Sequence, residues 1–169
     1  MLRRLVMTFG VVVNLLLVDQ IAKAAAIAAL KGRAARVVLE PVFNLAYVEN
    51  RGCAWGLLQG HVWPLAAFAV AALVLLFWKR DSVFPAGRCG RVAELLLYAG
   101  IIGNLIDRVV RGYVVDMFDV HWGVHHFPCF NVADAYITVA ATILILVAFC
   151  TRDKEAEPTG EEALGDGRA

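Results

Sequence analysis

The sequence has little net charge and no closely spaced pair of cysteines. Its 16 basic and 15 acidic residues leave a net charge of +1, so no strong field indicates a nucleic-acid partner. None of the four cysteines lies in C-x-x-C spacing, so neither a zinc knuckle nor a redox motif is indicated, and we expect them to pack as small apolar residues. No serine or cysteine stands next to a histidine, as nucleophilic catalysis would favour.

Long apolar blocks dominate the 169 residues. Hydrophobic residues make up 60% of the chain and its mean hydropathy is +0.67, whereas soluble domains have about 45–50% apolar residues. The pattern predicts a mainly α integral membrane protein with four transmembrane helices. The predicted spans are residues 5–25, 62–79, 92–110 and 131–150.

The first apolar run could instead be a secretory signal peptide, because residues 22–24 resemble a cleavage site. We favour a span, since three more apolar runs follow and Asp19 and Lys23 lie where cleavage would occur. In a continuous helix these two residues are one turn apart on the same face, so they can form an ion pair.

Residues outside the spans divide into two kinds. Residues 34–60 combine charges with β-branched and aromatic side chains, which predicts short strands in an extracytoplasmic β-cradle at the bilayer surface. Residues 151–169 are acidic and predict a disordered cytoplasmic tail after a membrane domain at 1–150. Four spans put both termini on one side, and nine basic residues there against seven on the other side favour the cytoplasm for the termini.

Three aspartates lie at the edges of the last two apolar runs: Asp107, Asp116 and Asp134. An ionisable group in the membrane costs about 2.5–3.5 kcal/mol on insertion scales, so we expect at least two of them to be used. Asn104, Asp107 and Arg108 share a helix face. We expect Asp107 to pair with Arg108, while Asn104 and Arg108 could hold a substrate carbonyl.

Asn131 and Asp134 fit two interpretations. Their spacing resembles a capping box at the start of the fourth span. Alternatively, a chain returning from the third span could bring Asp116 beside Asp134. Two carboxylates in one apolar site share a proton and can together activate water, as in aspartic proteases. A metal site at His121, His125, His126 and nearby Asp119 is not favoured, because loop histidines without fixed spacing are usually solvated.

Five motifs resemble those of the bacterial lipoprotein signal peptidases, also called signal peptidase II or prolipoprotein signal peptidase. They are DQIAK at 19–23, NRGCAW at 50–55, GNLIDR at 103–108, VVDM at 114–117 and FNVAD at 130–134. Their order, with four spans between them, makes the resemblance specific over residues 14–150. The sequence departs from the usual family pattern at Cys53, Trp55 and Ala99.

The resemblance implies an aspartic endopeptidase of the bacterial inner membrane, with four transmembrane helices, a β-cradle, no metal and no other cofactor. It implies cleavage of diacylglyceryl-modified prolipoproteins just before the lipid-modified cysteine, with the site at the outer face, next to membrane lipid. Cyclic peptide inhibitors of the globomycin type are expected to bind. The implied catalytic residues are Asp116 and Asp134. The implied substrate-binding residues are Asn50, Gly52, Asn104, Arg108 and Asn131, and the implied supporting residues are Asp19, Lys23 and Asp107.

Two other classes of function fit the intramembrane aspartates less well. A small transporter or channel subunit could use them as a proton or cation path, but its class often shows an internal repeat. A metal-dependent phosphotransferase would need more carboxylates at helical spacing around the metal.

Overall fold

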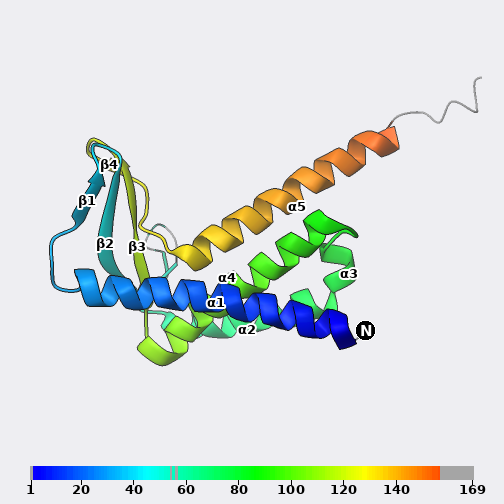
Figure 1. The fold of residues 1–169 in the computed structure, drawn as a ribbon, viewed down its shortest axis with the longest axis horizontal. Coiled ribbons are helices and arrows are strands. Elements are labelled where there is room, and N and C mark those ends of the chain that lie inside the picture. The colour runs from blue at the N-terminus through cyan, green and yellow to red at the C-terminus, as the bar shows by residue number, and fades with distance from the viewer. Residues whose placement is uncertain (1, 54, 56, 157–169) are drawn as a thin grey trace, which may run out of the picture.

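The computed structural model describes residues 2–53, 55 and 57–156 of the chain, as helices that meet a small sheet at one end (Figure 1). The helices are α1 (Leu2–Leu30), α2 (Val62–Trp78), α3 (Arg80–Val83), α4 (Arg88–Arg111) and α5 (Val132–Ala156). The strands are β1 (Arg36–Leu39), β2 (Phe43–Asn50), β3 (Val114–Trp122) and β4 (His125–His126).

Helix α4 is the centre of the helical part and packs against α1, α2 and α5. Glycines allow this close approach. A Cβ at Gly100 would lie 2.6 Å from the carbonyl oxygen of Ala133 in α5, and one at Gly103 would lie 2.7 Å from Oδ2 of Asp19 in α1. Small residues at helix contacts let backbones come together in membranes, where no hydrophobic force between helices drives association.

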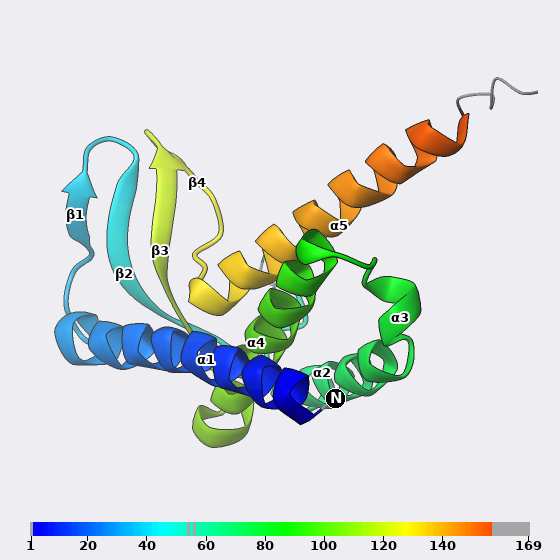
Figure 2. The same ribbon diagram turned by 45° about the vertical axis from the view of Figure 1, so that its right-hand side comes forward.

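The four strands form one antiparallel sheet in the order β1-β2-β3-β4. Figure 2 shows it standing at the C-terminal end of α1, where the N-terminal end of α5 also begins. Val115 and Met117 of β3 pack on Ala26 and Leu30 of α1, so the sheet and the first helix share a core. The predicted cradle at 34–60 is therefore only half of the sheet, because β3 and β4 come from the segment between α4 and α5.

The class expected from the composition, a mainly helical membrane protein with a small sheet, is confirmed. Three described helical segments are long and apolar enough to cross a membrane: Thr8–Leu30, Arg88–Arg111 and Val132–Thr151. The remaining predicted span, residues 62–79, corresponds to α2, which is apolar but has only 17 residues, at the lower end of the usual range of about 17–25. Trp63 and Trp78 at its two ends are largely exposed, as interfacial anchors are.

Helix α5 continues to Ala156, six residues into the segment expected to be a disordered tail. The remainder of that predicted tail, residues 157–169, lies outside the described residues.

Candidate active site

Asp134 is held in the first turn of α5 by Asn131, the residue before the helix. The Asn131 backbone N–H donates to Oδ2 of Asp134 over 3.2 Å, and the Asp134 backbone N–H donates to Oδ1 of Asn131 over 3.0 Å. This reciprocal pair is the capping box that the spacing predicts, with aspartate in place of glutamate. It fixes the orientation of the Asp134 carboxylate at the N-terminus of α5.

Asp116 enters the same hydrogen-bond network from β3. Nδ2 of Asn131 donates to its Oδ1 over 2.7 Å, and Nδ2 of Asn50 in β2 donates to its Oδ2 over 2.9 Å. Asn131 therefore satisfies both interpretations made from the sequence: it caps α5 and it links the two aspartates. The link requires that the chain between α4 and α5 return as a strand, and Gly112 with φ 76° ends α4 and begins that return.

Asn104 of α4 completes the network from a third element. Its Nδ2 donates to Oδ1 of Asp134 over 2.7 Å, and its Oδ1 accepts from Nδ2 of Asn131 over 3.2 Å. Nζ of Lys23 donates to the same Asn104 oxygen over 3.1 Å, which orients the amide so that its N–H group faces Asp134. Two carboxylates from different segments are thus fixed by three asparagines.

The environment of Asp116 disfavours its charged form. Asp116 is only 2% exposed. Burial and the neighbouring Asp134 carboxyl raise the pKa of Asp116 to about 7. The hydrogen bonds from the Asn50 and Asn131 amides lower the pKa, but by less than burial and Asp134 raise it. Asp116 therefore holds its proton more tightly than an ordinary aspartate does.

A fully buried ion cluster lies behind the network. Lys23 is paired with Asp19 over 2.9 Å and with Asp107 over 3.2 Å, and all three side chains are inaccessible to solvent. Oδ1 of Asp19 accepts from the backbone N–H of Ala133, and Oδ2 of Asp107 accepts from that of Val115. The cluster therefore fixes the backbone next to Asp134 and next to Asp116.

The expected pair between Asp107 and Arg108 is wrong. Asp107 pairs with Arg111, one helical turn away, while Arg108 donates to the carbonyl oxygen of Gly52 over 3.1 Å. Adjacent residues on a helix do not face each other, whereas residues four apart do, so the i, i+4 rule could have found this partner. Sequence reasoning also missed Gln20, whose side chain bonds both Asp19 and Asp107.

The loop after β2 is tied to the site at its start. The backbone N–H of Gly52 donates to Oδ1 of Asn50 over 2.9 Å, while the same Asn50 side chain holds Asp116. A Cβ on Gly52 would collide with the backbone carbonyl of Leu57, so glycine is required there. The hydrogen bond from Arg108 to the Gly52 carbonyl thus connects this loop to α4.

A cavity of about 890 Å³ opens beside these residues. Asn50, Asn104, Arg108 and Asp134 supply most of its polar lining, whereas Asp116 lies just behind the wall. Apolar side chains of α2, α4 and α5 line the rest, and Trp55 packs edge-on against Phe127 at 5.7 Å on one side. The cavity is thus polar beside the carboxylates and apolar along the helices.

Comparisons with known proteins agree with this arrangement. Residues 11–150 match the family model described as signal peptidase (SPase) II. A lipoprotein signal peptidase of Syntrophotalea carbinolica is 42% identical over 132 residues, which cover 76% of this chain and 82% of the relative. One of Haemophilus ducreyi is 38% identical over 123 residues, covering 69% and 75%. The chain belongs to the signal peptidase II family.

Two solved structures of bacterial membrane enzymes, obtained by the in meso method at 2.3 and 1.9 Å, share the fold of this family member. The first has a TM-score of 0.76 at 29% identity and covers 90% of this chain and 93% of its own. The second has a TM-score of 0.71 at 30% identity. Family membership and the apolar helices identify a peptidase of lipoprotein processing and a multi-pass inner-membrane protein.

The positions where the chain differs from the usual family pattern lie apart from the two aspartates. Cys53 and Trp55 line the cavity, and the Cys53 thiol lies 3.4 Å from the carbonyl oxygen of Leu57. Ala99 is fully buried in α4. These differences affect the cavity wall and helix packing, while the hydrogen bonds to Asp116 and Asp134 come from other residues.

Proposed function

We propose that this protein is a membrane aspartyl endopeptidase that removes the signal peptide from diacylglyceryl-modified prolipoproteins. Cleavage would occur on the N-terminal side of the lipid-modified cysteine, by water that Asp116 and Asp134 activate. The observation that carries the proposal is the pair of carboxylates joined through Asn131, next to a cavity that is polar at one end and apolar along the helices.

The two aspartates have different tasks in this proposal. Asp116, with a pKa of about 7, holds the shared proton, and Asp134, which lines the cavity, is the ionised base. Asp134 takes a proton from water as the water oxygen attacks the scissile carbonyl carbon, and the carboxyl proton of Asp116 passes to the carbonyl oxygen. When the tetrahedral species collapses, the C–N bond breaks and the amine of the lipid-modified cysteine leaves with a proton from Asp134. One hydroxyl on the former carbonyl carbon returns its proton to Asp116, so the released signal peptide ends in a carboxyl group and the starting protonation state is restored.

The other site residues hold the substrate and the carboxyls. Asn104 and Asn131 keep the carboxylates in position through charge-assisted hydrogen bonds. Arg108 already donates to two peptide carbonyls, those of Gly52 and Asn104, and has further N–H groups for a substrate carbonyl. The diacylglyceryl chains would lie along the apolar walls from α2 and α5, in contact with membrane lipid.

The proposal also places the sheet and the aspartates at the outer face of the membrane, with both termini in the cytoplasm. Two features support this orientation. The N-terminus and the far end of α5 lie at the opposite end of the helices from the sheet (Figure 1). Basic residues next to the spans are more numerous on the side of the termini.

The test is cleavage of a diacylglyceryl-modified prolipoprotein by the purified full chain, with mass spectrometry of the new N-terminus. We expect the lipid-modified cysteine to become the first residue, and a chelator to leave the rate unchanged.

Asp116→Asn and Asp134→Asn should each remove nearly all turnover while substrate binding persists, because neither asparagine can exchange the shared proton. The double variant should be little worse than either single one, since residues that act as a unit are not additive. Substantial turnover by either folded single variant would contradict the dyad.

A further inference from the structure

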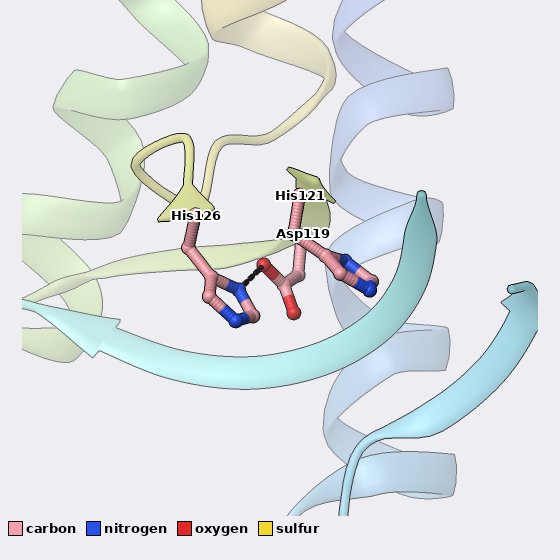
Figure 3. A group of neighbouring side chains, drawn as sticks. All are labelled: Asp119, His121 and His126. Atoms are coloured by element: carbon pink, nitrogen blue, oxygen red, sulfur yellow. Dashed lines mark hydrogen bonds and ion pairs between the residues drawn. The ribbon is translucent and has the colours of Figure 1, made fainter. Parts of the chain in front are cut away.

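A second group of ionisable side chains lies where β3 ends and β4 begins, and the proposed peptidase mechanism does not use it. Asp119 and His121 come from β3 and His126 from β4 (Figure 3). Their ligand-competent atoms all lie within 4.8 Å of one another. The sequence favoured solvated loop histidines here, because His121, His125 and His126 have no recognisable ligand spacing along the chain.

Strand geometry explains why these three residues meet. Asp119 and His121 are two apart on β3 and therefore project from the same face of the strand. His126 is the antiparallel partner of His121, and the two rings stack with centroids 4.8 Å apart. His125 pairs with Trp122 and belongs to the opposite face. Cross-strand pairing thus forms a cluster that spacing along the chain does not indicate.

The cluster has the properties of a set of metal ligands. Asp119 is buried, and its Oδ2 accepts from Nδ2 of Asn44 over 3.3 Å, which fixes the carboxylate as an outer hydrogen bond does in metal sites. Its Oδ1 lies 2.7 Å from Nδ1 of His126. Within the part of the chain that the structure describes, the buried Nδ1 of His121 has no hydrogen-bond partner. A buried polar atom without a partner is costly, and a metal bond is one way to satisfy it.

We propose that Asp119, His121 and His126 bind a divalent transition-metal ion, for which Zn²⁺ is the natural probe. Two imidazoles and one carboxylate are ligands that zinc accepts, with a water as the fourth. Bonds of about 2.0–2.2 Å in a tetrahedral site put ligand atoms about 3.4 Å apart. Ligand atoms up to 4.8 Å apart must therefore approach one another, and His126 Nδ1 must move away from Asp119 Oδ1, which lies 2.7 Å from it. The His126 side chain, 52% exposed, is free of close packing on its outer side and can make this adjustment. The bound ion ties β4 to β3 at the edge of the sheet.

The site is separate from the catalytic aspartates. Asp119 is three residues after Asp116 on the same strand, and an odd offset places the two side chains on opposite faces. Metal binding should therefore be independent of the peptidase reaction, and variants of the two sites should separate them.

The experiment is a calorimetric titration of the metal-free full chain with Zn²⁺, in detergent micelles and without a polyhistidine tag. We expect one ion per chain, and binding weakened at least about tenfold in His126→Ala and in His121→Ala. The matched control, His125→Ala, should bind as the unaltered chain does. Asp116→Asn should also keep full affinity. Co²⁺ in place of Zn²⁺ should give visible absorption bands that His126→Ala abolishes.

Thermal unfolding supplies a readout that does not depend on heat of binding. Zn²⁺ should raise the unfolding temperature of the unaltered chain and of His125→Ala, but not that of folded His126→Ala, because a ligand stabilises only the state that binds it. No binding by the unaltered chain, or equal binding by His126→Ala, would overturn the proposal. Loss of binding in Asp116→Asn would also overturn it, since the ion would then be held at the peptidase site.

Discussion

Asn131 is the residue on which the candidate active site depends most. One side chain caps α5, holds Asp116 and meets Asn104, while its backbone N–H holds Asp134. A capping residue is usually important only for its own helix, where its loss costs about 0.5–2 kcal/mol. Here the start of a helix and the spacing of two carboxyl groups are fixed by the same side chain, so local folding and the proposed chemistry cannot be separated.

The proton of Asp116 gives a testable pH dependence. Because burial and Asp134 raise its pKa to about 7, Asp116 carries the shared proton below that pH and loses it above. We expect turnover to fall about tenfold per pH unit on the alkaline side, starting near pH 7, and to fall again in acid when both carboxyls are protonated. The measurement is kcat/KM for peptide release from pH 4 to pH 10, because this ratio reports the pKa values of the substrate-free protein. A rate that stays flat from neutral pH to strong alkali would contradict this role for Asp116.

Asp107 should behave differently from Asp116, although both are buried. Its carboxylate pairs with Lys23 and Arg111 and accepts from the Val115 backbone, so its role is to hold β3 in place. Asp107→Asn keeps one oxygen for Val115 and leaves Lys23 its partner Asp19. We therefore expect a stability loss of about 1–3 kcal/mol with a partial loss of turnover, in contrast to the nearly complete loss in Asp116→Asn.

Unfolding temperature and turnover per folded molecule, measured on both variants, distinguish these roles. If Asp107→Asn is fully folded and as inactive as Asp116→Asn, then Asp107 takes part in the chemistry, and the division made here is wrong.

At the scale of elements, the sequence predicted helices better than strands. Apolar runs of sufficient length indicated α1, α4 and α5, because a span is defined by its own composition. The pairing of β2 with β3 was not predictable in the same way, since three helices separate the two strands along the chain and a strand pair has no signature in one segment alone. For the same reason, the contact between His121 and His126 was not predictable, because it depends on the register in which β3 and β4 pair.

The candidate site was predictable to the extent that its residues lie in short motifs. Asn131 and Asp134 are three apart, and Asp19 and Lys23 four apart, so helical spacing was enough to pair them. The hydrogen bond between Asp116 and Asn131 forms only because the chain returns from α4 as β3. The hydrogen bond between Arg108 and Gly52 forms only because the loop after β2 comes back to α4. Contacts of this kind require the tertiary fold.

The packing of α4 against its neighbours can be tested at Gly103. A Cβ there would lie 2.7 Å from the buried Asp19 carboxylate and 3.2 Å from Cβ of Ala133. Gly103→Ala should push α4 away from α1 and α5, with a destabilisation of about 1–3 kcal/mol, as overpacking usually costs. Turnover should fall as well, because Asn104 moves with the same turn of α4.

Gly10→Ala is the matched control, since among the described residues no atom lies within 4 Å of a Cβ at that position in α1. There the helix propensity of alanine should leave stability unchanged or slightly higher, by up to about 1 kcal/mol. Comparison of the two unfolding temperatures isolates the effect of close packing from that of propensity. Equal behaviour of the two variants would show that α4 tolerates a larger separation from its neighbours.

For the whole molecule, the arrangement of the helices relates the sheet, the carboxylates and the termini. The C-terminal ends of α1 and α4 and the N-terminal end of α5 meet the sheet. The site therefore lies at one end of the helical part, and the start of α1 and the far end of α5 lie at the other (Figures 1 and 2). Under the proposed function, a substrate whose lipid anchor lies in the bilayer would reach the carboxylates from the side, along the apolar wall of the cavity, without leaving the membrane.

This arrangement predicts opposite membrane sides for two reporter positions. A reporter fused after Ala169 should lie in the cytoplasm, and a cysteine label introduced at Val38 in the exposed strand β1 should react from outside. The reason is that the sheet and the far end of α5 lie at opposite ends of the spans, and the proposed orientation puts the sheet outside. The four native cysteines are replaced by alanine so that the label reports on position 38 alone: Cys53, Cys89, Cys129 and Cys150. The measurement is labelling of intact spheroplasts by a reagent that cannot cross the membrane, compared with labelling after lysis. Labelling of Val38→Cys only after lysis, together with an externally active C-terminal reporter, would show the opposite membrane orientation. The carboxylates would then lie at the inner face, where a translocated prolipoprotein cannot reach them.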